Sequence, residues 1–455
     1  VGKKSATSGS LNANITGNNI TTAGDLGISM ENPNVLYLNL SDNNIESAGY
    51  SIQYNQYYRN NGTIILSGNT FSNPQNWIVT STMTNDYIQS IIDGANNGDS
   101  ITFLTGTYND MALTISNALN LIGNGAILNN NGSSTIFTIT GSNSAGTNIT
   151  SFFINGSGTN NGINVVDTAN INIADNIFNN TYNAVSLSNV SESSISDNEI
   201  NNNTDNAIDI ADNGDLDNLD NVVIDGNTMI NTDGGIYLVG SGFTITNNYI
   251  DMNGSTGNGI SGSNVYSVLI ENNTLLNGDD GINIYKSYKN FTVNNNTIIN
   301  MGRDGISFVN HNAASIETDT STVITNNFVQ GNEYGLFIGG NFQGNVTNNV
   351  FDDSSLMGMQ IKGKQQATQG ILNANITGNN ITNADDLGIS MEHPDVEYLN
   401  LSANIIDSDG FSIQYNQYYR NNGDVILSGN TFINPQNWIV TSTMTNDYIQ
   451  SIIDG

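Results

Sequence analysis

An asparagine that returns about every 24 residues constrains this chain more than any other feature. Each occurrence reads apolar, two small or polar residues, Asn, any residue, apolar, as in ITGNNI at 15–20 and VNNNTI at 293–298. The repeated residues are Asn18, Asn43, Asn69, Asn176, Asn198, Asn227, Asn248, Asn273, Asn296, Asn327, Asn349, Asn379, Asn404 and Asn430. This period predicts a solenoid whose coils each carry one asparagine.

A second motif follows each asparagine after a short gap and reads Gly or Ala, apolar, polar, apolar, as in GIYL at 235–238 and GINI at 281–284. Its two-residue period predicts short strands, and the few polar residues between motifs can form a corner but not a crossover helix. Parallel pairing with the next coil, about 4.8 Å away, would bury the apolar positions. We therefore predict an all-β fold, a right-handed parallel β-helix of about 22–30 residues per coil.

The recurring asparagine has two expected roles. Asn tolerates left-handed backbone angles, so we place it at a tight corner. Its amide can also donate to and accept from the asparagines of adjacent coils, which forms a ladder and avoids a cost of about 1–3 kcal/mol for each unpaired buried amide. Leucine-rich repeats are the alternative solenoid, but their consensus and helical period are missing. The periodicity also argues against a disordered Asn-rich chain.

A longer repeat is superposed on the short one, because a shift of 361 positions places residues 1–94 on residues 362–455. Residues 73–94 recur without any change as residues 434–455. We predict that residues 1–83 are the last coils of one β-helix unit, that 84–444 form a complete unit, and that 445–455 begin the next.

One helix is expected, at about residues 84–97, where Tyr87, Ile88, Ile91 and Ile92 form an apolar stripe. Asp86 with Gln89 is the expected N-cap pair. An open solenoid end exposes strand edges and an apolar core, so we expect this short helix to cap the unit.

The same region resembles a known family. Residues 87–110 (YIQSIIDGANNGDSITFLTGTYND) and 113–128 resemble the opening of the pectin-lyase-like β-helices in adhesin-like surface proteins of methanogenic archaea. The matching elements are the helix ending in IDGA, the GDSI strand at 98–101, the GTY turn at 106–108 and the LNLIGNG coil at 119–125. The coil repeats that follow match as well. The resemblance implies the fold and an extracellular, cell-surface location, and no particular ligand.

Charge and composition exclude several functions. The net charge is −32 with nine Lys and Arg residues, so no basic surface is available for nucleic acid. No run of 18 apolar residues exists, so we expect no membrane span within this segment. Cysteine is absent, which excludes disulfides and thiolate metal sites.

Two carboxylate motifs are candidates for a catalytic site. NGDDGI, with Asp279 and Asp280, and NTDGGI, with Asn231–Asp233, are similar to polygalacturonase elements, and paired carboxylates can cleave glycosidic bonds. However, Asp233 and Asp279 lie two coils apart, and Asp-Gly before a strand is common in corners. Arg303 lies near Asp304 and His311, but a single arginine on a solvated face favours no lyase. The sequence therefore predicts no catalytic residues and no enzyme.

Two binding sites are candidates. Asp212, Asp215, Asp217 and Asp220 form an acidic loop that suits Ca²⁺, although a solvated loop is the alternative. No cofactor is required otherwise. The QYNQYYRNNG segment and its second copy offer a glycan platform, with packing between coils as the alternative. Its tyrosines are Tyr54, Tyr57, Tyr58, Tyr415, Tyr418 and Tyr419.

Asn-x-Ser/Thr sequons are frequent in this Asn-rich chain, and some outward ones are glycosylation candidates if the chain is exported. They include Asn39, Asn61, Asn131, Asn155, Asn189, Asn253 and Asn290.

These features together predict a structural extracellular repeat protein that forms a rigid cell-surface fibre or adhesin stalk by end-to-end stacking of β-helix units. Its expected partners are other units or copies of the same protein. The first alternative is an adhesin that binds cell-surface glycans, and the second is a polysaccharide lyase or hydrolase.

Overall fold

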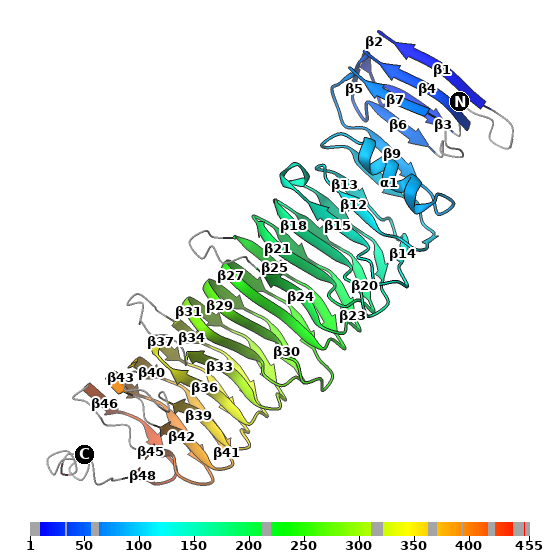
Figure 1. Cartoon of the computed structure of the whole chain (residues 1–455). Coiled ribbons are helices and arrows are strands. Elements are labelled where there is room, and N and C mark those ends of the chain that lie inside the picture. Colours follow the sequence, from blue (N-terminus) through cyan, green and yellow to red (C-terminus); the bar gives the residue numbers. More distant parts are fainter. Residues whose placement is uncertain are drawn as a thin grey trace. The chain divides into compact units, whose positions relative to one another are not determined.

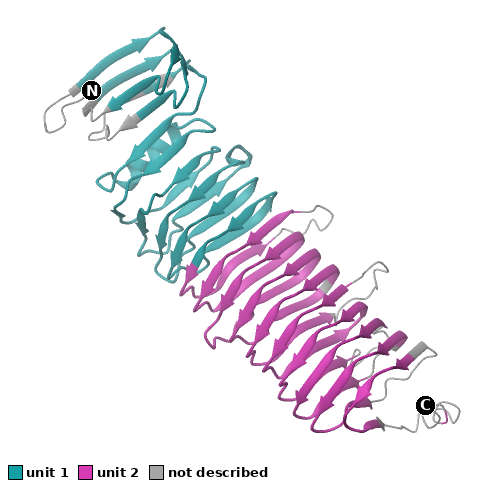
Figure 2. Ribbon diagram, turned by 180° about the vertical axis from the view of Figure 1, so that it is seen from behind, with its two compact units in different colours: residues 1–199 teal, residues 200–455 magenta. Residues whose placement is uncertain are grey.

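A computed structural model describes residues 10–31, 34–55, 63–211, 220–310, 322–362, 371–392, 395–416, 424–439 and 450. The chain divides into two compact units, residues 1–199 and 200–455, which are coloured separately in Figure 2. Each unit is a stack of parallel strands (Figure 1).

The first unit contains one α-helix, α1 (Asn85–Gly94), and a 3-10 turn at Ser142–Ser144 among its described residues. Its strands are β1 (Ser10–Thr16), β2 (Asn19–Ala23), β3 (Ile28–Glu31), β4 (Asn34–Ser41), β5 (Asn44–Ser47), β6 (Ile52–Asn55), β7 (Thr63–Ser67), β8 (Thr70–Phe71), β9 (Asn76–Val79), β10 (Ser100–Phe103), β11 (Thr107–Tyr108), β12 (Leu113–Ile115), β13 (Asn120–Ile122), β14 (Ile127–Asn129), β15 (Phe137–Thr140), β16 (Asn148–Thr150), β17 (Phe153–Asn155), β18 (Ile163–Ala169), β19 (Asn172–Ala174), β20 (Ile177–Asn179), β21 (Val185–Ser191) and β22 (Ser194–Ser196). Strand β23 (Glu199–Asn201) includes the last residue of this unit.

The second unit continues the strand numbering. Its strands are β24 (Asn206–Ala211), β25 (Val222–Asp225), β26 (Thr228–Ile230), β27 (Gly234–Thr246), β28 (Tyr249–Asp251), β29 (Ile260–Glu271), β30 (Thr274–Leu276), β31 (Ile282–Asn294), β32 (Thr297–Ile299), β33 (Asp304–Asn310), β34 (Thr322–Thr325), β35 (Phe328–Gln330), β36 (Tyr334–Gly340), β37 (Phe342–Thr347), β38 (Val350–Asp352), β39 (Met357–Lys362), β40 (Ile371–Thr377), β41 (Asn380–Ala384), β42 (Leu387–Glu392), β43 (Asp395–Ser402), β44 (Ile405–Ser408), β45 (Ile413–Asn416), β46 (Asp424–Ser428), β47 (Thr431–Phe432) and β48 (Gln436–Ile439).

Each coil of the second unit has three strand segments, as β33, β34 and β35 illustrate. Every segment pairs in parallel with its equivalent one coil on, so β33 pairs with β36, β34 with β37 and β35 with β38. In β27, β29 and β31 the first two segments run on as one long strand. The predicted right-handed parallel β-helix is confirmed.

The core consists of inward side chains that stack in register from coil to coil. Ile236 pairs with Ile260, and Ile282 pairs with Ile306, and all four are fully buried. Complete burial of such a side chain contributes about 1.5–3 kcal/mol. The glycine before each of these isoleucines has no room for a side chain. A Cβ on Gly281 would lie 2.4 Å from Cγ2 of Ile298 and 2.5 Å from the carbonyl oxygen of Gly305.

The asparagine ladder is confirmed in each unit. In the second unit it runs through Asn227, Asn248, Asn273, Asn296, Asn327, Asn349, Asn379, Asn404 and Asn430. The Oδ1 atom of Asn296 accepts from the backbone N–H of Asn273 at 2.9 Å and from its Nδ2 at 3.0 Å. The Nδ2 of Asn273 also donates to the carbonyl oxygen of Ile245 at 2.9 Å. The first unit has the same links from Asn18 to Asn43 to Asn69, and from Asn176 to Asn198.

The predicted corner geometry is wrong by one position. The left-handed residue precedes the ladder asparagine, as at Asn247 (φ 58°), Asn272 (φ 58°) and Gly378 (φ 69°), whereas no ladder asparagine has a positive φ. The corner therefore uses two residues. The first supplies the backbone angle that Asn and Gly tolerate, and the second supplies the amide.

Helix α1 covers a strand edge in the first unit. Its residues Ile88, Ile91 and Ile92 are buried. Gln89 reaches β12, where its Nε2 donates to the carbonyl oxygen of Thr114 and its Oε1 accepts from the backbone N–H of Thr114, both at 2.8 Å. Gln89 therefore satisfies the edge of β12 that faces away from β15.

The N-cap of α1 differs from the prediction. Thr84, not Asp86, accepts from the backbone N–H of Tyr87 through its Oγ1 at 3.3 Å. Gln89 is unavailable for a capping box because it binds Thr114.

Strand pairing continues on both sides of α1. Strand β9, which precedes the helix, pairs with β6 on one edge and with β10, which follows the helix, on the other. Strand β10 then pairs with β13. The helix thus covers the edge of β12 without interrupting the neighbouring row of strands. The predicted boundaries at 83/84 and 444/445 stay predictions.

The two copies of the long repeat fold alike within their own units. The pairing of β1 with β4 shifts register between Leu11 and Asn12, and that of β40 with β43 shifts at Leu372 and Asn373. These positions are equivalent in the two copies.

Candidate functional site: a carboxylate and arginine cluster

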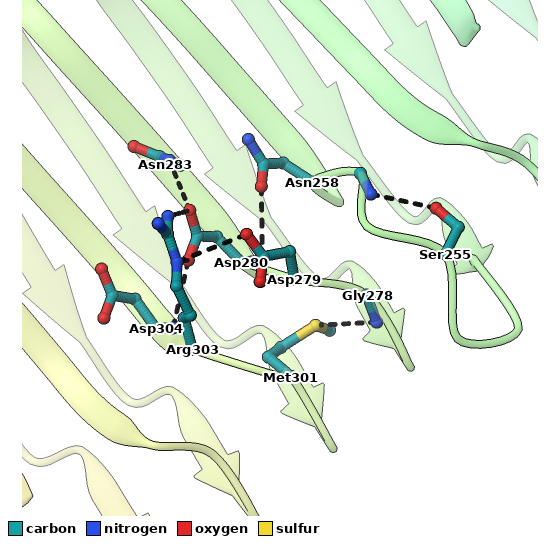
Figure 3. A network of polar contacts seen from close by, with 10 residues as sticks. Ser255, Asn258, Gly278, Asp279, Asp280, Asn283, Met301, Arg303 and Asp304 are labelled. Atoms are coloured by element: carbon teal, nitrogen blue, oxygen red, sulfur yellow. Dashed lines mark hydrogen bonds and ion pairs between the residues drawn. The ribbon is translucent and has the colours of Figure 1, made fainter.

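Four charged residues from two successive coils gather at the start of β31 and β33. Asp279 and Asp280 lie just before β31, and Arg303 and Asp304 lie at the start of β33. Because Ile282 of β31 pairs with Ile306 of β33, the residues that precede these two isoleucines lie side by side in adjacent coils. We call Asp279, Asp280, Arg303 and Asp304 the carboxylate–arginine cluster (Figure 3).

Asp280 is the buried centre of the cluster. Its Oδ2 accepts from Nη2 of Arg303 at 2.5 Å, and its Oδ1 accepts from Nε at 3.2 Å. The backbone N–H of Asp304 donates to Oδ1 at 3.1 Å, and Nδ2 of Asn283 donates to Oδ2 at 2.5 Å (Figure 3). A buried carboxylate is tolerated only with such partners, so Asp280 fixes the orientation of Arg303.

The outer members of the cluster reach solvent. Nε of Arg303 also lies 3.3 Å from Oδ2 of Asp279. The side chain of Arg303 is 52% exposed and that of Asp279 is 33% exposed, whereas that of Asp280 is 0% exposed. One positive and one negative group are therefore accessible above a buried anchor.

The environment raises the pKa of two carboxyl groups. Burial, followed by the nearby charge of Asp280, raises the pKa of Asp304 to about 7. Burial also raises the pKa of Asp279, and the Arg303 guanidinium opposes this. A carboxyl group with a pKa near 7 is present in both its protonated and its ionised form at neutral pH, and this suits proton transfer.

Aromatic and cationic side chains lie on the same outward face. Asn283 and Tyr285 alternate along β31, so they project from one face of the sheet. The hydroxyl of Tyr285 lies 3.3 Å from that of Tyr237, two coils earlier. Burial, together with Tyr285, raises the pKa of Tyr237 to about 12. Nζ of Lys286 lies 5.5 Å from the centroid of the Tyr285 ring.

Asp233, which the sequence offers as a partner of Asp279, is not part of the cluster. Asp233 is exposed and lies two coils from Asp279. Arg303 and Asp304, one coil further on, are the neighbours that matter. Alignment of coils on Gly281 and Gly305 would have revealed them, because an aspartate precedes both glycines. His311 lies outside the described residues.

The proposed calcium loop stays a prediction. Asp212, Asp215 and Asp217 lie outside the described residues. Oδ2 of Asp220 accepts from the backbone N–H of Ser241 at 3.2 Å. Within the described ranges, no group of three or more His, Cys, Asp or Glu residues could hold a metal ion.

The tyrosine platform needs a correction at Tyr415. This side chain is 1% exposed, and its hydroxyl lies 3.3 Å from Oε1 of Gln436, so it cannot offer a ring face to a sugar. Tyr57, Tyr58, Tyr418 and Tyr419 lie outside the described residues, as does the side chain of Tyr54. Tyr54 itself pairs with Trp77 through the strand backbone.

The sequons divide by exposure. Asn131, Asn189, Asn253 and Asn290 are exposed. Asn39 and Asn155 are half-buried, and Nδ2 of Asn155 donates to Asn129 at 3.1 Å, which occupies the nitrogen that would carry a glycan. Asn61 lies outside the described residues.

Comparison with protein families supports the fold. The family described as "Right handed beta helix region" matches residues 215–320, which contain the whole cluster. No curated protein matches the sequence. In the described part of the chain, no helix combines the length and apolarity that a membrane span requires.

Solved structures share this architecture at low sequence identity. The catalytic unit of a thermostable GH87 alpha-1,3-glucanase from Streptomyces thermodiastaticus is 13% identical, with a TM-score of 0.52 over 80% of this chain and 70% of that chain. PfbA, a surface adhesin of Streptococcus pneumoniae, is 13% identical, with a TM-score of 0.46 over 74% and 89%. The Siphovirus 9NA tailspike receptor binding domain is 12% identical, with a TM-score of 0.48 over 81% and 77%.

The prediction that the chain is not an enzyme is contradicted by this comparison. The glucanase shows that a β-helix of this kind carries a catalytic unit. The structure also removes one reason for the prediction, because Asp280 meets the backbone of Asp304 across a single coil spacing and Arg303 contacts both Asp279 and Asp280. The chain is a right-handed parallel β-helix, the architecture on which that catalytic unit is built.

Proposed function

We propose that the chain belongs to an extracellular, cell-surface adhesin. Tandem β-helix copies form its stalk, and the carboxylate–arginine cluster binds carbohydrate on the side of the coils. The observation that carries the binding role is the departure of these coils from the repeat. At the position of Asp304, the aligned strands of the following coils carry Tyr334 and Met357.

The cluster has the groups that a sugar requires. The planar guanidinium of Arg303 and the carboxylate of Asp279 can each engage a pair of hydroxyl groups, and both are accessible. The ring of Tyr285 lies on the same face of the sheet, where it offers an apolar surface to a pyranose. Few polar groups beside aromatic rings are typical of small-ligand sites.

Binding to a panel of polysaccharides tests this role. Arg303→Met should weaken binding at least tenfold, because it removes the exposed planar donor. The matched control is Lys362→Met, whose Nζ pairs with Glu392 at 3.3 Å and lies in a different coil. Equal binding by the native chain and Arg303→Met, with both folded by circular dichroism, would exclude the cluster as the site.

The stalk role rests on the repeat. The first copy of residues 73–94 is followed by β10, which pairs directly with β9, so one copy of the long repeat passes into the next through strand pairing. Electron microscopy of the native protein should therefore show fibres with one repeating density per 361-residue copy. Separate beads on flexible linkers would contradict this role.

A second candidate function is glycoside hydrolysis, which the raised pKa of Asp304 favours. Asp304 would protonate the glycosidic oxygen as the bond to the anomeric carbon breaks. Asp279 would accept a proton from the water whose oxygen bonds to that carbon. Release of reducing ends from a bound polysaccharide, abolished in Asp304→Asn, would support hydrolysis. A bound polysaccharide that stays intact over prolonged incubation would leave binding as the only role.

A further inference from the structure

Asp99 contacts the coil that precedes helix α1, where one copy of the long repeat is predicted to meet the next. It follows helix α1, immediately before β10, and is 2% exposed. Its Oδ1 accepts from the backbone N–H of Gln75 at 2.8 Å, and its Oδ2 accepts from Nε2 of Gln75 at 3.1 Å. Nε1 of Trp77 donates to the same Oδ2 at 3.4 Å.

These donors all belong to the segment that recurs unchanged in the second copy. The fourth donor, the backbone N–H of Asn96, comes from the loop that carries Asp99 itself, at 2.9 Å. One carboxylate of Asp99 therefore accepts three hydrogen bonds from the preceding copy, two from Gln75 and one from Trp77. Strands β9 and β10 pair directly beside this contact. Their pairing begins with Asn76 opposite Ser100 and ends with Val79 opposite Phe103.

The second copy contains the same strand, β48. Strand β48 is the equivalent of β9 and pairs with β45, as β9 pairs with β6. Gln436 is the equivalent of Gln75, which is fully buried against Asp99. The first copy therefore shows that a strand of this sequence is covered by β10, which carries Asp99 just before it.

We propose that the outer edge of β48 is a docking site for a further copy of this repeat, whose strand equivalent to β10 pairs with it. The carboxylate at the Asp99 position recognises Gln436 and Trp438, the equivalents of Gln75 and Trp77. The inference rests on the stalk role proposed above, and it adds the residue that makes the junction specific. A strand that lacks this carboxylate leaves the donors of the edge unsatisfied, which disfavours other partners.

The test extends the full chain after Gly455 with a second copy of residues 95–199, because Gly455 is the equivalent of Gly94. Trp438 is observed alone by replacing Trp77 with Phe, since the chain has two tryptophans. We expect the extension to shift Trp438 emission to the blue and to slow amide exchange at 436–439 at least tenfold. Asp99→Asn in the appended copy alone should return most of this protection, whereas Asp110→Asn there, with an exposed side chain, should not.

Two results would overturn the proposal. If the appended strands are themselves protected but 436–439 exchange as fast as in the unextended chain, β48 is not the docking site. If Asp99→Asn in the appended copy leaves protection intact, the carboxylate does not recognise the edge. In the native chain, Asp99→Asn should speed exchange at 76–79, which gives the same answer if the extended chain does not fold. Imaging separates the two levels, because continuous fibres with an unprotected β48 would retain the stalk and reject this junction.

Discussion

The backbone N–H of Asp304 donates to the carboxylate of Asp280 one coil earlier, at 3.1 Å. Two carboxyl groups are therefore held close together where water is largely excluded. Asp280 has the guanidinium of Arg303 as its partner, so the cost of a second negative charge falls on Asp304. This difference between Asp280 and Asp304 explains why the pKa of Asp304 is raised and why Asp304 is the candidate proton donor.

The first prediction concerns the pH dependence of stability. The pKa of Asp304 is raised from 3.8 to about 7 on folding, so the folded chain binds this proton more tightly than the unfolded chain. Its contribution is most favourable below about pH 4 and is lost as the pH rises towards 7, by at most about 4 kcal/mol. Asp304→Asn should be more stable than the native chain at pH 7, with the advantage vanishing near pH 4. Denaturant melts at both pH values check this, and a constant difference would contradict it.

The second prediction concerns the ion pair. Arg303→Met should cost a few kcal/mol, because it leaves the buried Asp280 carboxylate without its main partner. Asp280→Asn combined with Arg303→Met should recover much of this loss, since the buried charge of Asp280 is then removed together with its partner. Urea unfolding of the single and double variants forms the test. Additive effects of the two changes would show that the pair is not coupled.

The third prediction concerns the ladder. Asn273→Leu should cost about 1–3 kcal/mol, because it removes an acceptor for the two donors of Asn248 and the donor to Ile245. Asn18→Leu is the matched control, since Asn18 is exposed and donates to Asn43 at the start of the described ladder. Thermal melts that move equally for both variants would argue against a buried role.

The fourth prediction concerns close packing of the coils. Gly281→Ala should destabilise the chain by about 1–3 kcal/mol, because its Cβ would lie too close to Ile298 and to the backbone of the next coil. Gly94→Ala has open space around the new Cβ and should be close to neutral. Calorimetry that finds no difference between the two would refute the packing argument.

Periodic features of this fold could be predicted from the sequence because each coil repeats the same local problem. Ile236 and Ile282 follow a two-residue period, and Asn273 recurs at a fixed place between apolar residues, so the strands and the ladder were predictable. The left-handed angle lies at Asn272, one residue before the predicted position at Asn273, because two adjacent asparagines satisfy the same pattern.

Contacts that occur once were harder to predict. The cluster was missed because Arg303 meets Asp280 only through the register of β31 with β33, and a motif search along the chain compares Asp279 with Asp233 instead. The N-cap was misplaced because Gln89 binds Thr114 on another strand. In each case the decisive partner lies in the adjacent coil.

The asparagine ladder also gives the coil stack a direction. In the second unit the backbone N–H and the Nδ2 of each ladder residue donate to the Oδ1 of the next ladder residue along the chain, from Asn227 to Asn430. The amide dipoles are therefore aligned, as peptide dipoles are in a helix. One end of such a ladder presents a carbonyl oxygen and the other presents N–H groups. Two copies can join their ladders head to tail, whereas head-to-head contact would set acceptor against acceptor.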